Sequence, residues 1–299
     1  MARRNGGAAG PDGVAVVDKP AGWTSHDVVA KARGLLGTRR VGHAGTLDPD
    51  ATGVLVLGVG RATRLLAYLS GLGKRYEGEV VLGTATATLD ASGEVTGTWD
   101  MTGVGLEDVR AAAAGLTGEI DQVPPMVSAK KVDGRRLHEL ARAGVDVDRA
   151  AVRVRVDELA VGEPVAPGVY PVAVSCSSGT YVRSLAADLG AALGGGAHLR
   201  ALRRLAVGPF TIDEATALES LTPESLLPPA EALRGRPAVL VDDEVAALVA
   251  HGRVLEAAVL GVSGDGPWPV LDAAGRLLAV YEPHRGTTVK PGVVLSSPG

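Results

Sequence analysis

The segment from Lys74 to Leu82 alternates polar and apolar residues, and this period of two indicates a β-strand with one buried face. Further segments have strand character, as short apolar runs or as looser alternation: 14–17, 54–59, 153–161, 170–176 and 199–207. Segments with helical spacing lie between them, but strands and helices do not follow one another in regular alternation. This order argues against a doubly wound parallel fold and predicts an α+β fold around a large mixed β-sheet.

The helices are predicted from their end signals as well as from their spacing. Thr24 or Ser25 suits the N-cap of a helix that continues to about Leu36, and Gly37 closes it. Apolar spacing predicts further helices at 61–69, 106–116, 180–193 and 243–251. We expect these helices to flank the sheet.

A proline-rich stretch from Pro223 to Pro237 divides the chain into two parts. With 299 residues, 46% of them hydrophobic, the chain has room for one large domain and one small domain. We expect the large domain at 13–235 and a small β-rich domain at 236–299, where short strands are broken by Gly and Pro. Residues 1–12 lack an apolar stretch, so we expect a disordered tail and not a signal peptide.

Composition excludes several classes of protein. The formal net charge is −4, so a nucleic acid would have to be bound through local basic patches. The single cysteine, Cys176, cannot form an internal disulfide, and the six histidines show no ligand spacing, so we expect no metal. No stretch approaches the roughly 20 apolar residues that a membrane span requires. We therefore expect no membrane association and a cytoplasmic location.

The segment Gly42–Gly53 is the strongest candidate for chemistry. Its sequence, GHAGTLDPDATG, holds three glycines and a proline, and an apolar strand follows at once. Such a loop is tightly specified, and an acidic side chain on it, Asp48, can be held rigidly in a cleft. Taken alone, Asp48 is better explained as a plain Asx-type turn.

Several motifs occur together and in a fixed order, and the set resembles the TruB family of tRNA pseudouridine synthases. Besides the Asp48 loop, the motifs are DKPAGWTS at 18–25, KRY at 74–76, LDASG at 89–93, SGTYVR at 178–183 and LRRLAVG at 202–208. The resemblance covers roughly 13–235 and implies the family's mixed-sheet catalytic core. The segment 236–299 resembles, more loosely, the PUA-like domain that members often carry.

The resemblance implies that Asp48 is the essential carboxylate in the isomerisation of uridine 55 of the tRNA T-loop. A carboxylate can stabilise, attack or deprotonate an electron-poor sugar carbon, and the sequence leaves these three roles open. Burial would raise the pKa of this carboxyl, so a cation beside it is needed to keep it ionised. The family's arginine falls on Arg183, and Asp90 is expected to complete an Asp–Arg–Asp network.

Other site residues are also carried over from the resemblance. Tyr76 is expected to stack on the target base and to handle the C5 proton. Expulsion of a base from its stack costs roughly a few kcal/mol, which His43 would partly offset by wedging against the RNA. The remaining substrate-binding positions are Tyr181, Leu202, Lys19, Lys131 and Arg142.

Lys131 and Arg142 lie in an expected RNA-clamping insertion at 124–150. Five basic residues fall between Lys130 and Arg142, against two acids. Val127 and His138 stand where many members are expected to carry aromatics. A second basic patch that could contact phosphate consists of Lys31, Arg33, Arg39 and Arg40.

We therefore expect a monomeric tRNA pseudouridine synthase that needs no cofactor and no protein partner. The alternative of another class is a non-catalytic module that binds or folds tRNA. A glycoside hydrolase using Asp48 and Asp50 is disfavoured, because two acids separated by one proline do not obviously flank a glycosidic bond. A guide-RNA-dependent synthase would share the catalytic motifs, but the basic insertion favours a stand-alone enzyme.

Overall fold

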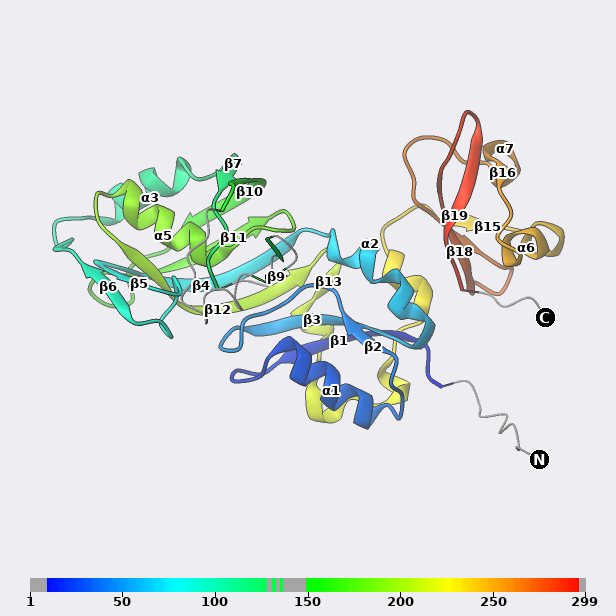
Figure 1. Ribbon diagram of the computed structural model, residues 1–299, viewed down its shortest axis with the longest axis horizontal. Coiled ribbons are helices and arrows are strands. Elements are labelled where there is room, and N and C mark those ends of the chain that lie inside the picture. Colours follow the sequence, from blue (N-terminus) through cyan, green and yellow to red (C-terminus); the bar gives the residue numbers. More distant parts are fainter. Residues whose placement is uncertain (1–9, 128–130, 133–134, 137–148, 296–299) are drawn as a thin grey trace.

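The computed structural model describes residues 10–127, 131–132, 135–136 and 149–295. The molecule is elongated, with the small C-terminal sheet at one end and the β5–β6 hairpin near the other (Figure 1). The helices and 3₁₀ turns are α1 (Ser25–Leu35), η1 (Gly60–Leu65), α2 (Leu66–Ser70), α3 (Leu106–Ala114), α5 (Val182–Ala192), η2 (Ile212–Glu214), η3 (Leu218–Ser220), η4 (Pro223–Ser225), η5 (Pro229–Leu233), α6 (Asp243–Ala250) and α7 (Ala257–Leu260).

The large sheet is mixed, as expected, and its main path runs in the order β14-β1-β3-β12-β4-β11-β10-β7. Its strands are β1 (Gly13–Lys19), β3 (Thr52–Val59), β4 (Lys74–Leu82), β7 (Gly118–Gln122), β10 (Val152–Val161), β11 (Val169–Cys176), β12 (Ala197–Val207) and β14 (Thr216–Ala217), with β2 (Val41–His43) on β3 and β13 (Phe210–Thr211) on β12. Short pairs are β5 (Thr84–Thr86) with β6 (Val95–Thr98), and β8 (Lys131–Val132) with β9 (Arg135–Arg136).

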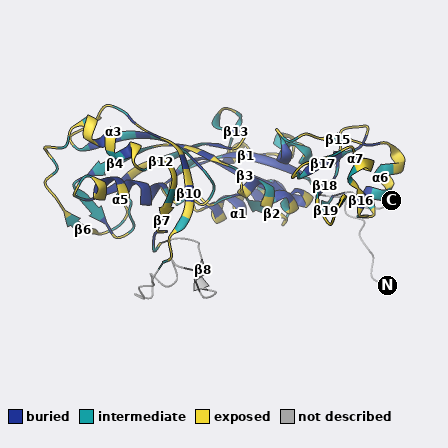
Figure 2. Cartoon of the chain, turned by 90° about the horizontal axis from the view of Figure 1, so that it is seen from above, coloured by how far each residue is buried: buried dark blue, intermediate teal, exposed yellow. Residues whose placement is uncertain are grey.

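The segments Val14–Val17 of β1 and Val54–Val59 of β3 are continuously non-polar because both of their faces are buried (Figure 2). On β3, Val54 and Val56 point to one core, while Leu55 and Leu57 point to the other. Helix α1 covers the second core, and η1, α2 and η5 cover the first. A strand that is buried on both sides loses the polar–apolar alternation, which explains the continuous run in the sequence.

The other half of the sheet carries α3 and α5 on one face. Val109 of α3 and Leu185 of α5 pack into one core with Val80 of β4 and Val156 of β10. The other face of β4 bears polar side chains such as Glu77 and Glu79, which gives the alternation seen in the sequence.

Most predicted elements are found within one or two residues of their expected ends. Thr24 caps α1 in a capping box with Asp27, as its position indicated. The expected helix at 61–69 is instead a 3₁₀ turn followed by the short α2. The β5–β6 hairpin and the short strand β7 were not predicted. Asp12, which we assigned to the tail, forms an ion pair with Arg61.

The C-terminal sheet has the order β15-β17-β18-β19-β16. Its strands are β15 (Val239–Leu240), β16 (Leu255–Glu256), β17 (Trp268–Leu271), β18 (Leu277–Pro283) and β19 (Thr288–Val294). It packs on the segment formed by η1 and α2, where Tyr68 Oη donates to Glu282 Oε1 at 2.6 Å and Arg61 Nη1 to the Leu295 carbonyl at 2.8 Å. No helix within the described ranges has the length and apolar character to cross a bilayer.

Candidate active site

Asp48 lies in the loop between β2 and β3, and this loop is held from two sides. Ser25, at the buried start of α1, accepts from the Leu47 amide at 2.9 Å, and its hydroxyl donates to the Leu47 carbonyl at 3.1 Å. The Ala51 amide donates to the Asp48 carbonyl at 3.2 Å and closes the turn. Buried Leu47 anchors the loop in the core beside Asp48. The position of the carboxylate is thus fixed by the residues around it.

Lys19 also holds this loop, through hydrogen bonds to backbone carbonyls. Its ammonium donates to the carbonyls of Pro20 (2.9 Å), Trp23 (2.6 Å) and Pro49 (2.9 Å), and the residue is fully buried. Three acceptors use all three donors of an ammonium group. Lys19 was expected to contact the substrate, and these hydrogen bonds indicate a role in bracing the loop. In this structure Lys19 braces the loop and does not reach the surface where a substrate would bind.

Arg183 holds the Asp48 carboxylate with two donors. Its Nε lies 2.9 Å from Asp48 Oδ2, and its Nη2 lies 3.2 Å from Asp48 Oδ1. Arg183 is 4% exposed, whereas the side chain of Asp48 is 41% exposed. The cation is thus enclosed and the anion accessible, so the carboxylate can be reached from the pocket while its orientation stays fixed.

Asp90 is the third member of the expected network, at a longer distance. Its Oδ2 lies 3.6 Å from Arg183 Nη1, and that nitrogen also donates to the Thr88 carbonyl at 2.8 Å. The other oxygen of Asp90 accepts from the hydroxyls of Thr88 and Ser92, each at 2.6 Å. The structure therefore brings Asp48, Arg183 and Asp90 together, with Asp48 as the tighter partner of the arginine.

The ion pair with Arg183 alone would lower the pKa of the Asp48 carboxyl, but in the folded protein this pKa is raised. Burial raises the pKa of the Asp48 carboxyl and outweighs the lowering by Arg183, and the negative charge of Asp90 raises it further. A carboxylate with a raised pKa is a better base and nucleophile than an exposed one, provided that it is ionised. Arg183 limits the rise and so favours the ionised form.

Tyr76 lies on β4 directly opposite Arg204 on β12. Arg204 is 1% exposed and donates to carbonyls of the catalytic loop and β3, namely those of Gly45 (3.2 Å), Thr46 (3.4 Å) and Val54 (2.7 Å). Burial raises the pKa of the Tyr76 phenol, although Arg204 opposes this. The phenol is therefore protonated at neutral pH.

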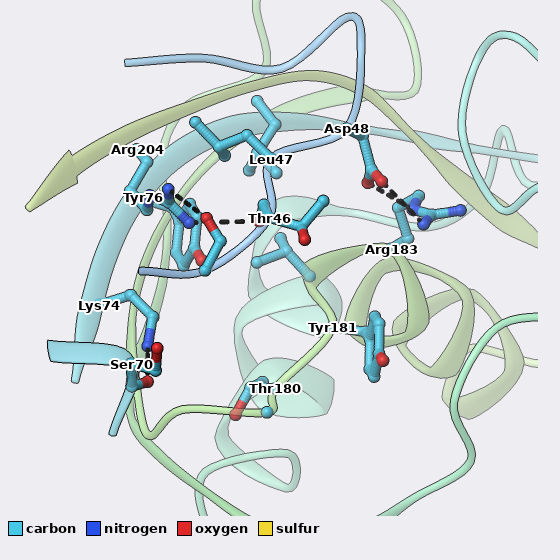
Figure 3. A pocket seen from close by; sticks show the side chains of 14 residues that line it. Thr46, Leu47, Asp48, Ser70, Lys74, Tyr76, Thr180, Tyr181, Arg183 and Arg204 are labelled. Atoms are coloured by element: carbon cyan, nitrogen blue, oxygen red, sulfur yellow. Dashed lines mark hydrogen bonds and ion pairs between the residues drawn. The ribbon is translucent and has the colours of Figure 1, made fainter. Parts of the chain in front are cut away.

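A cavity of about 250 Å³ connects these groups (Figure 3). Its lining comes from the catalytic loop, the end of α2, β4, the start of α5 and β12. The residues are Gly45, Thr46, Leu47, Asp48, Ser70, Lys74, Tyr76, Gly179, Thr180, Tyr181, Val182, Arg183, Leu202 and Arg204. Tyr181 and Leu202 thus lie where a bound base was expected. The described residues contain no cluster of side chains suited to hold a metal ion.

Among the described side chains, His43 is an expected contact that is not part of this cavity lining. His43 is half-buried on β2, with its ring edge against His26 at 5.4 Å between centroids, and burial lowers the pKa of its imidazole. A neutral ring suits stacking on a base. Arg142 lies outside the described residues, and of Lys131 only the backbone strand is described. Lys31, Arg39 and Arg40 are exposed at α1 and the turn after it.

Sequence reasoning gave no role in the site to Lys74, Ser25 or Arg204. Each lies within a motif that was recognised, since Lys74 precedes Tyr76 by two residues and Arg204 is the second arginine of LRRLAVG. A charged residue at an inward-facing position of a strand was the signal that could have revealed Lys74 and Arg204. Ser25 was interpreted only as a possible helix cap.

Comparison with known proteins identifies the family. A family model described as "TruB family pseudouridylate synthase (N terminal domain)" matches residues 33–182, and one described as "tRNA pseudouridylate synthase B C-terminal domain" matches 183–233. The chain belongs to the TruB family. The matched segments contain every residue of the Asp48–Arg183–Asp90 network and of the cavity lining.

The chain is similar over nearly its whole length to proteins named tRNA pseudouridine synthase B. It is 50% identical to that of Streptomyces coelicolor, over 92% of this chain and 95% of the relative, and 48% identical to that of Thermobifida fusca, over 95% and 99%. Among solved structures, a "Cbf5-Nop10-Gar1 Complex" matches with a TM-score of 0.75 at 26% identity, over 96% of this chain and 85% of that one.

Proposed function

We propose that this chain is a tRNA pseudouridine synthase that isomerises uridine 55 in the T-loop, with Asp48 as its catalytic carboxylate. The observation that carries the proposal is the accessible carboxylate held by two donors of a buried arginine at a base-sized cavity. TruB membership and the names of close relatives supply the substrate class.

The geometry suggests how the work is divided among the residues. The reaction breaks the bond between uracil N1 and ribose C1′, turns the base, joins C5 to C1′ and removes the C5 proton. Asp48 is the accessible anion, so it would stabilise, attack or deprotonate the sugar while Arg183 keeps it ionised and oriented. The protonated Tyr76 phenol would support the base by stacking. These steps use side chains alone, and we propose no cofactor.

The insertion at 124–150 would hold part of the RNA. The described residues at and beside its two ends form hydrogen bonds that link it to the active site. The Val127 carbonyl accepts from Arg183 Nη2 at 2.8 Å, and the Val123 carbonyl accepts from Ser184 Oγ at 3.0 Å. Arg149, at the other end of the insertion, donates to the Pro124 carbonyl at 2.9 Å. We propose Lys131, Arg142 and His43 as tRNA contacts, and a monomer in the cytoplasm as the working form.

The decisive experiment maps pseudouridine by position in unmodified tRNA incubated with the purified chain, together with release of hydrogen from uridine C5. We expect modification of one T-loop uridine by the wild type and no turnover by Asp48→Asn, with tRNA affinity within about threefold because binding rests on other contacts. Asp50→Asn is the matched control, since Asp50 is exposed and lies outside the cavity lining. Binding without turnover by the wild type would instead support a tRNA-folding module.

A further inference from the structure

Lys74 is a buried cation for which the mechanism above has no role. It lines the cavity, is 8% exposed, and lies with Ser70 at the end away from Asp48 and Arg183 (Figure 3). Its Nζ donates to the carbonyls of Ser70 at 2.9 Å and Leu72 at 2.7 Å. An ammonium group has three donors, so these two acceptors leave one donor for a ligand in the cavity.

The charge of Lys74 is poorly compensated within the part of the chain that the structure describes. No carboxylate lies within ion-pair distance of its Nζ there. The cation that affects it most is Arg204, which pairs with Tyr76, two residue pairs further along the β4–β12 ladder. Burial and, to a smaller extent, the charge of Arg204 lower the pKa of Lys74 to about 8, and Cys176 on β11 opposes them. A desolvated cation without a counter-ion is expected to stabilise an anion that enters the site.

The proposed reaction produces such an anion. When the N1–C1′ bond breaks, the bonding electrons stay on the uracil and spread over N1, O2 and O4. Asp48 fixes the sugar end of the cavity and Lys74 lies at the other end, with Tyr76 on the same face of β4 as Lys74. A base attached to a sugar at Asp48 would therefore point its carbonyl edge toward Lys74.

We propose that Lys74 donates its third N–H to a carbonyl oxygen of the target uracil and stabilises the uracil anion while the base is detached from the ribose. This inference rests on the proposed function of the cavity. Lys74 transfers no proton. The electrons return from the ring when C5 bonds to C1′, C5 then loses its proton to solvent, and N1 takes up a proton from solvent. A half-turn of the base about its N3–C6 axis exchanges O2 with O4, so one donor serves the base before and after it turns.

The first test uses Lys74→Met, with Lys290→Met as the matched control, because Lys290 is exposed on β19 of the C-terminal sheet. We expect Lys74→Met to lower the single-turnover rate constant by about 100-fold, with tRNA affinity within about threefold of the wild type. The wild-type kcat should fall as pH rises through about 8, where Lys74 loses its charge, and this alkaline limb should be absent in Lys74→Met. A folded variant with normal kcat, or with the limb retained, overturns the proposal.

The main readout of the second test uses the wild type and does not depend on whether the variant folds. Transcripts with 2-thiouridine or 4-thiouridine at the target position replace one carbonyl with a weak acceptor. We expect at least one of them to slow the wild-type kcat by about tenfold, and not to slow Lys74→Met any further. Full wild-type rate on both analogues overturns the role of Lys74. Failure of the proposed function is distinguishable, because the wild type would then form no pseudouridine in any transcript.

Discussion

Arg183 lies 2.9 Å from Asp48 but 3.6 Å from Asp90, so the arginine is shared unequally between two carboxylates. Asp90 also accepts three hydrogen bonds from Thr88 and Ser92, which fix it independently of the arginine. The network therefore has one accessible anion and one supporting anion. Their different distances give different expectations for substitutions.

Asp90→Asn should reduce kcat by only about three- to tenfold, whereas Asp48→Asn should abolish turnover. The amide keeps most of the hydrogen bonds of Asp90 and removes one charge at a long, partly solvated distance, which is a small electrostatic change. Release of tritium from C5 of labelled uridine measures both rates. Equal losses in the two variants would show that Asp90 takes part in the chemistry directly.

The pH profile should have an acid limb set by Asp48. Its pKa is raised in the folded protein, and the ionised form is the reactive one. Activity is therefore present above that pKa and is lost as pH falls through it, at a higher pH than for an exposed aspartate. In Asp90→Asn the repelling charge is gone, so the limb should move to lower pH. The measurement is kcat/KM between about pH 4 and pH 7, with circular dichroism at each pH to detect unfolding.

Gly53 should tolerate no side chain. It has a φ of +102°, and a Cβ added there would lie 2.2 Å from the Arg204 carbonyl oxygen, where two backbones approach. We expect Gly53→Ala to lower the free energy of unfolding by about 3 kcal/mol or more, as measured in urea. The control is Gly37→Ala, which also has a positive φ but open space around it, and should cost about 1 kcal/mol. Similar losses in the two variants would contradict the steric argument.

The sequence predicted the helices and strands of this protein better than the tertiary contacts between them. Strand β4 was predicted at its observed ends because most of its nine residues follow a period of two. The helix at 61–69 was wrong in type, since helical spacing does not distinguish a 3₁₀ turn from a short α-helix. Periodicity also cannot show that Arg204 enters the core, because its three carbonyl acceptors come from residues about 150 positions away.

The same limit applies to Lys19, for which a contact with the substrate was predicted. Its place in the DKPAGWTS motif suggested a functional lysine, and a lysine is normally exposed. Its role depends on the loop that contains Pro49, thirty residues later, which supplies one of its acceptors. Asp48 and Arg183, in contrast, could be assigned, because their motifs are specific even though they are 135 residues apart in the chain.

Lys19→Met should therefore act on stability and on kcat, and leave tRNA affinity nearly unchanged. The change removes the donor of three buried carbonyls at once, so we expect the free energy of unfolding to fall by about 2–4 kcal/mol. The loop that carries Asp48 would then lose its brace at Pro49, and kcat should fall while KM changes little. Urea unfolding and steady-state kinetics measure the two effects, with Lys290→Met as the exposed control. A raised KM with unchanged stability would mean instead that Lys19 contacts the RNA, as its motif first suggested.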